Sequence, residues 1–121
     1  MMHWTGTWNK YGNRKTELDG HTFDSKLEAD RYIELRLLEK SGVIKDLKLQ
    51  QEFELIPAYK KNGRTVRAAK YVADFTYFTA GGEFIVEDTK GQRTEGYRLK
   101  KKLFEYKYPY TIKEVTRDDI R

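Results

Sequence analysis

Cysteine is absent from this chain of 121 residues, and histidine occurs only twice, at His3 and His21. Without cysteine there can be no disulfide and no thiolate metal site, and the composition suits a reducing compartment. Two isolated histidines are too few for a histidine-rich zinc site. These absences exclude the common structural zinc centres.

Long apolar stretches are also lacking, since no run approaches the roughly 18 residues that a membrane span requires. The opening residues, Met1 to Trp4, include no apolar signal segment, so we expect a cytoplasmic protein without a membrane partner. Hydrophobic residues make up 38% of the chain and charged residues 36%. We therefore expect one soluble domain with a modest core, a heavily charged exterior and no small-molecule cofactor.

The chain has a formal net charge of +5 and an isoelectric point near 9.3, which favours nucleic acid as its acidic partner. Basic residues are concentrated between residues 93 and 107 and between residues 10 and 15. Lys100, Lys101 and Lys102 are spread around a predicted helix and cannot all face one ligand. We predict that DNA contacts come from Arg14, Lys15, Arg93, Arg98, Lys100 and Lys101.

The start of the chain predicts an arm and a hairpin. Residues 1–15 show no hydrophobic period, so we expect an extended arm ahead of a single domain over residues 16–121. The dipeptide Asp19-Gly20 predicts the turn of a short hairpin over residues 15–23.

A helix and a strand are predicted next. Ser25, followed by Glu28, matches a capping box, and Gly42 is a suitable C-terminal cap for the helix that begins there. Apolar and polar residues alternate over residues 44–55, which indicates a half-buried strand. The apolar stripe of the helix is expected to include Leu27, Ile33, Leu35, Leu37 and Leu38.

The end of the chain predicts a second helix over residues 94–106, broken by Pro109, and a last strand over residues 110–116. A turn is expected at residues 60–64. The order of elements indicates an α/β or α+β domain with a mixed sheet. The buried side of the second helix is expected to carry Leu99, Leu103 and Tyr106.

Three charged residues are expected to converge on one face of a predicted hairpin over residues 71–90. A three-residue loop centred on Gly81 would place Asp74 directly opposite Asp88. Lys90 follows two positions later and shares the face of Asp88. Two carboxylates and an ammonium group side by side are unfavourable unless a cation or an anionic substrate joins them.

This constellation suits metal-dependent phosphodiester hydrolysis. Asp74 and Asp88 are hard oxygen ligands of the kind that Mg²⁺ prefers, and the backbone carbonyl of Thr89 is a candidate third ligand. A bound Mg²⁺ can activate a water and neutralise charge on the phosphate. Lys90 can orient the attacking water or stabilise the pentacoordinate phosphate.

Residues 71–75 (YVADF) and 85–91 (IVEDTKG) resemble the motifs of the PD-(D/E)XK nuclease superfamily. The predicted order of elements also matches its restriction-endonuclease-like core, which has a helix, a three-stranded meander, a helix and a strand. Ala73 departs from the motif, because proline is frequent at that position. The resemblance covers roughly residues 10–116.

The resemblance implies roles for individual residues. It identifies Asp74, Asp88 and Lys90 as catalytic, and it implies that Glu28 on the first helix completes the metal site. It further implies Mg²⁺ as cofactor, with Mn²⁺ able to substitute. Through residues 23–29 (FDSKLEA), the strand that contains Gln51 and residues 94–104, the chain is similar to a small phage- and prophage-borne family, and similar proteins include Holliday-junction resolvases. That similarity implies a homodimer in a bacterial host cell that cleaves branched DNA during recombination or replication.

Simpler interpretations stand beside these. Asp88 and Lys90 can form an ordinary ion pair, and the capping box alone accounts for Glu28. Glu87 is expected on the opposite face, supporting the site from behind or facing solvent, and Gln51 is expected to be a hydrogen-bonded amide on an apolar face.

Three alternative functions remain open. One is a nuclease with the same core that acts on other DNA, as nicking, repair or transposition enzymes do. The second is a non-catalytic DNA-binding module, and the third is a phage protein whose basic surface binds a host factor. The aromatic arm, with Trp4, Trp8 and Tyr11, can stack on bases or pack against a dimer partner.

Overall fold

A computed structural model describes residues 5–8, 14–90 and 93–120, and for residues 5–8 and Arg14 it describes the backbone alone. The two helices are α1 (Lys26–Lys40) and α2 (Glu95–Lys107). The strands are β1 (Thr5–Trp8), β2 (Arg14–Leu18), β3 (His21–Phe23), β4 (Ile44–Ile56), β5 (Tyr59–Lys61), β6 (Arg64–Val66), β7 (Ala69–Thr79), β8 (Phe84–Thr89) and β9 (Ile112–Val115), and a 3₁₀ turn, η1 (Arg117–Asp119), follows.

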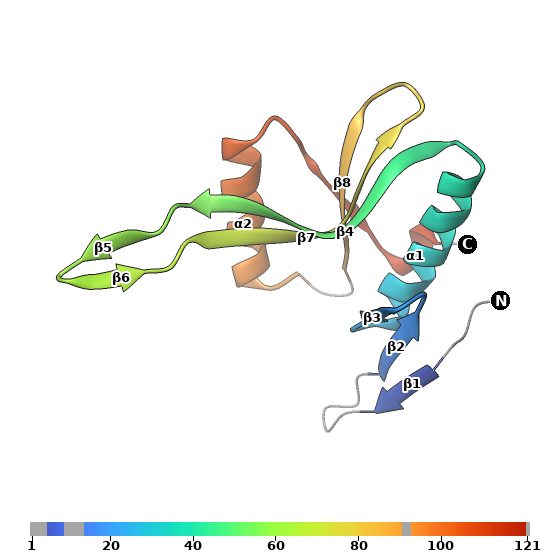
Figure 1. Ribbon diagram of the computed structural model, residues 1–121, viewed down its shortest axis with the longest axis horizontal. Coiled ribbons are helices and arrows are strands. Elements are labelled where there is room, and N and C mark those ends of the chain that lie inside the picture. The colour runs from blue at the N-terminus through green and yellow to red at the C-terminus, as the bar shows by residue number, and fades with distance from the viewer. Residues whose placement is uncertain (1–4, 9–13, 91–92, 121) are drawn as a thin grey trace.

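The central sheet has the strand order β4-β7-β8-β9. Its β4–β7 and β7–β8 pairs are antiparallel, whereas β8 and β9 are parallel, which confirms the predicted mixed sheet in an α+β domain. Figure 1 shows α1 and α2 on either side of the point where the strands cross. Within the described residues, no helix is long and apolar enough to cross a membrane.

The helix ends follow the predicted capping residues. The hydroxyl of Ser25 accepts a hydrogen bond from the Glu28 amide at 3.1 Å, and α1 ends before Gly42, whose φ of 82° is the left-handed conformation that glycine adopts readily. The hydroxyl of Thr94 caps α2 in the same way, and the helix ends two residues before Pro109. These boundaries are confirmed.

The buried faces of the helices differ from the prediction. Leu37, Leu99 and Tyr106 are 58%, 57% and 91% exposed, so they are not core residues. Leu37 lies two positions from the buried Leu35, and Tyr106 lies two positions from the buried Phe104. Since two positions correspond to about 200° around a helix, these residues point away from the sheet. Each helix therefore buries one narrow stripe, which includes Tyr32 and Leu35 on α1 and Tyr97 and Phe104 on α2.

The buried side chains form two clusters. The first lies under α1 and includes Tyr32, Leu35 and Phe75, and the second lies under α2 and includes Tyr71 and Phe104. Asp74 falls between them, because Ala73 before it belongs to the second cluster and Phe75 after it to the first. One continuous sheet therefore joins two half-cores with a polar residue at their boundary.

The N-terminal segment is not a plain arm. Its residues Thr5–Trp8 form β1, which pairs with β2, so the expected boundary at residue 15 falls inside a strand. The predicted hairpin is confirmed as β2 and β3, with Asp19 and Gly20 at positive φ in its turn. Leu18 and Phe23 from this hairpin are buried in the first cluster, which attaches the N-terminal sheet to α1. Trp4 and Tyr11, with the Trp8 side chain, lie outside the described part of the chain.

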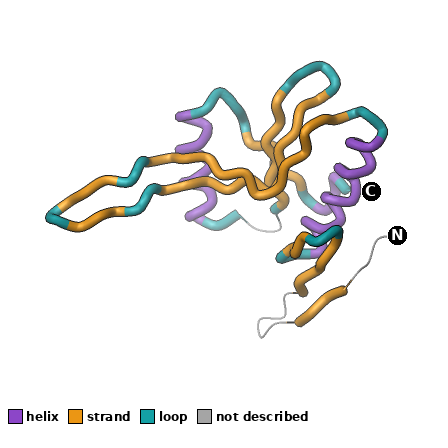
Figure 2. Tube along the Cα trace, viewed as in Figure 1, coloured by secondary structure: helices purple, strands orange, loops and turns teal. Residues whose placement is uncertain are grey.

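The β4–β7 pair continues beyond the body of the protein into a second hairpin, β5 and β6. Its turn residues, Asn62 and Gly63, have φ values of 52° and 74°. Two consecutive positive φ values are typical of the tight turns that join twisted antiparallel strands. The predicted turn at residues 60–64 is thus the tip of a projecting two-stranded ribbon (Figure 2).

Candidate active site

The candidate site lies where β7 and β8 part. Their backbone pairing begins at Phe78 with Phe84 and ends at Phe75 with Glu87. The next residues in that register are Asp74 and Asp88, which are therefore opposite each other, as the loop length predicted. Beyond this point β7 stays paired with β4, and β8 with β9. The two carboxylates occupy the opening between the diverging strands.

Asp74 is held across this opening by the opposite strand. Its Oδ2 accepts hydrogen bonds from the amide and from the hydroxyl of Thr89, each at 2.8 Å. These two bonds take the place of the β7–β8 ladder, which has ended one residue earlier. The side chain of Asp74 is therefore fixed in position by the segment that contains Asp88.

Asp88 is almost fully buried, with 3% of its surface exposed. The hydroxyl of Tyr71 donates to its Oδ2 at 2.8 Å, and the Lys90 ammonium lies 3.1 Å from its Oδ1. Lys90 also lies over the ring of Tyr97, 4.2 Å from the ring centroid. The expected Asp88–Lys90 ion pair is present, but it forms part of a larger buried arrangement.

Glu28 reaches this site from the first turn of α1. Its amide donates to Ser25, as the capping box predicts, and its carboxyl group interacts electrostatically with Asp74. The cap therefore accounts for the backbone of Glu28 and leaves its side chain available to the site. Glu28, Asp74, Asp88 and Lys90, predicted from three separate segments, are brought together.

The carboxyl groups of this cluster repel one another when they are ionised, so they cannot all carry a charge at the same time. Burial raises the pKa of Glu28, and the neighbouring Asp74 carboxylate raises it further. Burial also raises the pKa of Asp88, with Asp74 adding to the effect and Lys90 and Tyr71 opposing it. A single ammonium group does not offset three converging carboxyl groups.

The donor chemistry fits a hard divalent cation, since the converging groups are carboxylates. Within residues 5–8, 14–90 and 93–120, no group of three or more acidic or histidine side chains is arranged as a metal site. Asp88 has one oxygen hydrogen-bonded to Tyr71 and the other paired with Lys90. Binding an ion would require Asp88 to exchange the ammonium for it.

A basic hollow of about 400 Å³ adjoins the site through Tyr97. Three of the predicted DNA-contacting residues, Arg93, Arg98 and Lys101, line it, together with Lys102. Lys100 is exposed and is not among the lining residues. Lys15 is exposed on β2 of the separate N-terminal sheet, and the side chain of Arg14 lies outside the described residues.

Glu114 organises the wall of this hollow. Its carboxylate accepts hydrogen bonds from Arg93 at 3.0 Å and from Tyr97 at 2.7 Å, and Lys101 lies 3.5 Å away. The hydrogen bond from Arg93, opposed in part by burial and reinforced by Tyr97 and Lys101, lowers the pKa of Glu114 to about 2.

Glu114 is therefore expected to stabilise the fold above pH 4.5, its usual pKa, and to lose this contribution as the pH falls toward 2. We expect Glu114→Gln to lower the free energy of unfolding at pH 6 by roughly 1–2 kcal/mol, because solvent screens the partly exposed partners. Urea unfolding of both proteins between pH 6 and about pH 2.5 measures the difference. The difference in unfolding free energy between the two proteins should shrink as the pH falls. A difference that stays constant would contradict this role of Glu114.

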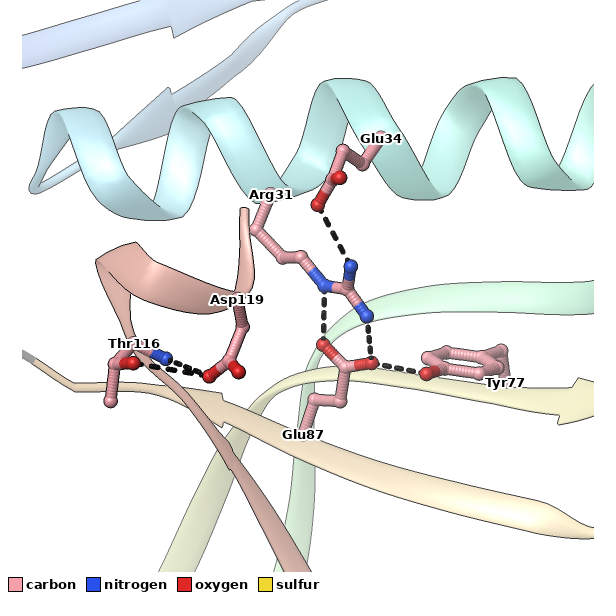
Figure 3. Close-up of polar contacts among 6 residues, drawn as sticks. All are labelled: Arg31, Glu34, Tyr77, Glu87, Thr116 and Asp119. Carbon is pink, nitrogen blue, oxygen red and sulfur yellow. Dashed lines mark hydrogen bonds and ion pairs between the residues drawn. The ribbon is translucent and has the colours of Figure 1, made fainter. Parts of the chain in front are cut away.

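Glu87 was not recognised as a core residue. It is fully buried, and its two carboxylate oxygens accept hydrogen bonds from Arg31 on α1 at 2.8 and 2.6 Å. The hydroxyl of Tyr77 also donates to Glu87, and Arg31 bonds Glu34 at 2.9 Å (Figure 3). The solvent-facing alternative for Glu87 is wrong, although the prediction that it faces away from Asp88 agrees with the strand register.

Three other polar residues complete this description. Gln51 accepts a hydrogen bond from the Thr76 hydroxyl at 2.6 Å, which confirms the satisfied amide. Tyr71, which bonds Asp88, was missed, because no local pattern distinguishes a tyrosine that packs from one that also donates to a carboxylate. For Arg31 a signal existed, since a charged residue stands one turn before the buried Leu35 of α1.

Comparison with known proteins gives one match. A family model described as "Protein of unknown function (DUF1064)" matches residues 8–117. No curated protein and no solved structure matches significantly. The matched range includes both helices, the central sheet and every residue of the candidate site.

Proposed function

We propose that this chain, which belongs to the DUF1064 family, is a metal-dependent endodeoxyribonuclease that cleaves branched DNA. The observation that carries the proposal is the convergence of Glu28, Asp74 and Asp88 beside Lys90, in the opening between two diverging strands. The element order α1, β4–β7–β8, α2 and β9 supports a restriction-endonuclease-like core, which the YVADF and IVEDTKG segments also resemble.

Oxygen ligands for the ion would come from Glu28, Asp74, Asp88 and the carbonyl of Thr89. Mg²⁺ or Mn²⁺ bound there would neutralise phosphate charge and lower the pKa of a water. Lys90, released from Asp88, is placed to hydrogen-bond the attacking water or a phosphate oxygen. Tyr71 keeps the second oxygen of Asp88 in position. In-line attack on the phosphorus would then leave 5′-phosphate and 3′-hydroxyl ends.

The DNA-binding part of the proposal is supported by the basic hollow beside Tyr97, whose Arg93, Arg98 and Lys101 side chains are suited to phosphate groups. The branched substrate, the phage or prophage origin and the bacterial host cytoplasm are supported by the family resemblance of residues 23–29, the strand that contains Gln51 and residues 94–104. A homodimer is proposed because resolving a four-way junction requires two cuts, and each chain contributes one site.

The test is incubation of the pure protein with three labelled DNAs: a four-way junction, a flap and a linear duplex. We expect cleavage of the branched DNAs with Mg²⁺ or Mn²⁺ and none with EDTA, because the carboxylates need a cation to act on a phosphodiester. Product ends are identified by ligation, which requires a 5′-phosphate. Equal cleavage of the linear duplex would remove the branched-DNA specificity, and no cleavage of any DNA would contradict the enzyme.

A further inference from the structure

The hairpin of β5 and β6 projects from the body of the protein at the far end of the β4–β7 ribbon (Figures 1 and 2). Every residue of both strands is exposed. After β6 the chain runs directly into β7, the strand that carries Asp74. The hairpin is therefore joined to the strand that bears Asp74 by only two residues, Arg67 and Ala68, yet its own residues belong to neither core cluster.

The projecting segment carries charge of one sign. No acidic residue occurs between Leu55 and Ala73. Lys70, at the base of the ribbon, pairs with Glu52 at 2.8 Å. The remaining four cations form no ion pair with any acidic side chain in the part of the chain that the structure describes. These four residues are Lys60, Lys61, Arg64 and Arg67.

The tip of the hairpin brings two of these cations together at a cost in stability. Lys61 and Arg64 are direct cross-strand partners next to the Asn62-Gly63 turn. Like charges directly opposite each other destabilise a strand pair. An anionic ligand at this position would convert the repulsion into a favourable interaction.

Both faces of the hairpin are basic. Successive strand residues point to opposite faces, so Lys60 lies on one face and Lys61, with Arg64, on the other. A folded acidic protein would meet a single face of the ribbon. The two walls of a DNA groove present phosphates to both faces, and the major groove, about 12 Å wide, admits a two-stranded ribbon.

We propose that the β5–β6 hairpin is a second nucleic-acid-binding element, which enters the groove of duplex DNA about one helical turn away from the phosphodiester held at the candidate site. Arg64 and Asp74 are separated by extended chain, which at about 3.3 Å per residue gives a reach of roughly 30 Å. One turn of B-DNA advances about 34 Å. The inference rests on the proposed function for the identity of the substrate and goes beyond it in naming a new contact surface.

Affinity for duplex DNA tests the charge argument. The variant is Lys61→Gln with Arg64→Gln, and the control is Lys40→Gln with Lys45→Gln, two exposed cations at the opposite end of the molecule. Anisotropy titrations use a labelled duplex of about three helical turns in EDTA, so that no cleavage occurs. We expect the hairpin variant to bind about 10- to 50-fold more weakly, with the slope of log K against log[salt] reduced by about 2. The charge-preserving variant, Lys61→Arg with Arg64→Lys, should bind as tightly as the wild type.

The absence of cysteine allows the position of the hairpin on DNA to be mapped directly. An iron chelate attached to Thr65→Cys, an exposed position on β6, should cut a bound branched DNA about 10 bp from the metal-dependent cleavage site. Cuts adjacent to that cleavage site, or equal weakening by the hairpin variant and its control, would overturn the inference.

The two proposals fail in different ways. If the protein binds DNA through the hairpin but hydrolyses no DNA, the hairpin inference stands and the enzyme proposal falls. If the protein hydrolyses DNA while the hairpin variant keeps wild-type affinity in EDTA, the enzyme proposal stands and the hairpin inference falls. If the hairpin variant lost affinity for an acidic polypeptide but kept wild-type affinity for duplex DNA, the hairpin inference would also be overturned.

Discussion

Replacing Asp74 with alanine is expected to lower metal-dependent cleavage by about a thousandfold or more, since metal-bound carboxylates contribute several kcal/mol to the stabilisation of a phosphoryl transition state. Asp74 lies in the candidate site, hydrogen-bonded to Thr89 and close enough to Glu28 to raise the pKa of that carboxyl group. Single-turnover cleavage of a labelled four-way junction in Mg²⁺ measures the loss.

DNA binding should survive this substitution, because the basic hollow and the hairpin do not include Asp74. Asp74→Asn is the second variant, since its amide oxygen can still accept the hydrogen bonds of Thr89 while the negative charge is removed. Asp118→Ala, at an exposed position of η1, is the matched control and should cleave normally. Wild-type cleavage by Asp74→Asn would refute the proposed metal site, and loss of DNA binding together with cleavage would show that Asp74 acts on binding or folding and not on the chemical step.

Replacing Glu87 with alanine is expected to cause the largest loss of stability of any change discussed here. The Arg31 guanidinium, 10% exposed, would lose both of its hydrogen bonds to Glu87 and keep only the one to the partly exposed Glu34. Removing one member of a buried ion pair costs about 3–5 kcal/mol. In a domain of this size that loss corresponds to a fall in Tm of roughly 10–20 °C, which calorimetry or thermal circular dichroism measures.

The matched control is Glu52→Ala, which breaks the exposed Lys70–Glu52 ion pair and should change Tm little. A double variant, Arg31→Met with Glu87→Leu, removes both buried charges and should recover most of the lost stability. If Glu87→Ala and Glu52→Ala have the same Tm, the Arg31–Glu87 pair contributes nothing beyond a surface contact.

Short sequence patterns correctly predicted those parts of the fold, such as hairpin register and helix starts, that depend on residues close together in the chain. The loop centred on Gly81 sets the register of its hairpin, so the apposition of Asp74 and Asp88 follows from counting residues. Ser25 and Thr94 set the helix starts by the same local chemistry. The core of the candidate site was therefore predictable as a set of residues, although its catalytic role remains a proposal.

The features that were missed depend on contacts distant in the sequence. Glu87 can be buried because Arg31, from a separate element, donates a hydrogen bond to each of its two carboxylate oxygens. Alternation within β8 places Glu87 on a face but says nothing of what covers that face. Similarly, Leu99 and Tyr106 match an apolar pattern, yet the narrow sheet under α2 leaves them exposed. The burial of a side chain was therefore predicted wrongly where it depends on which helices and strands pack against each other.

The parallel pairing of β8 with β9 has a consequence for protein synthesis. The amide of Lys90 donates to the carbonyl of Val115 at 2.9 Å, and Arg117 bonds Asp30 on α1 at 2.7 Å. The first contact needs Val115 and the second needs Arg117, so neither can form before the last strand has been made. In a growing chain on the ribosome, β8, the strand that bears Asp88, therefore has no partner on its β9 side until β9 has emerged, and the candidate site is completed late in synthesis.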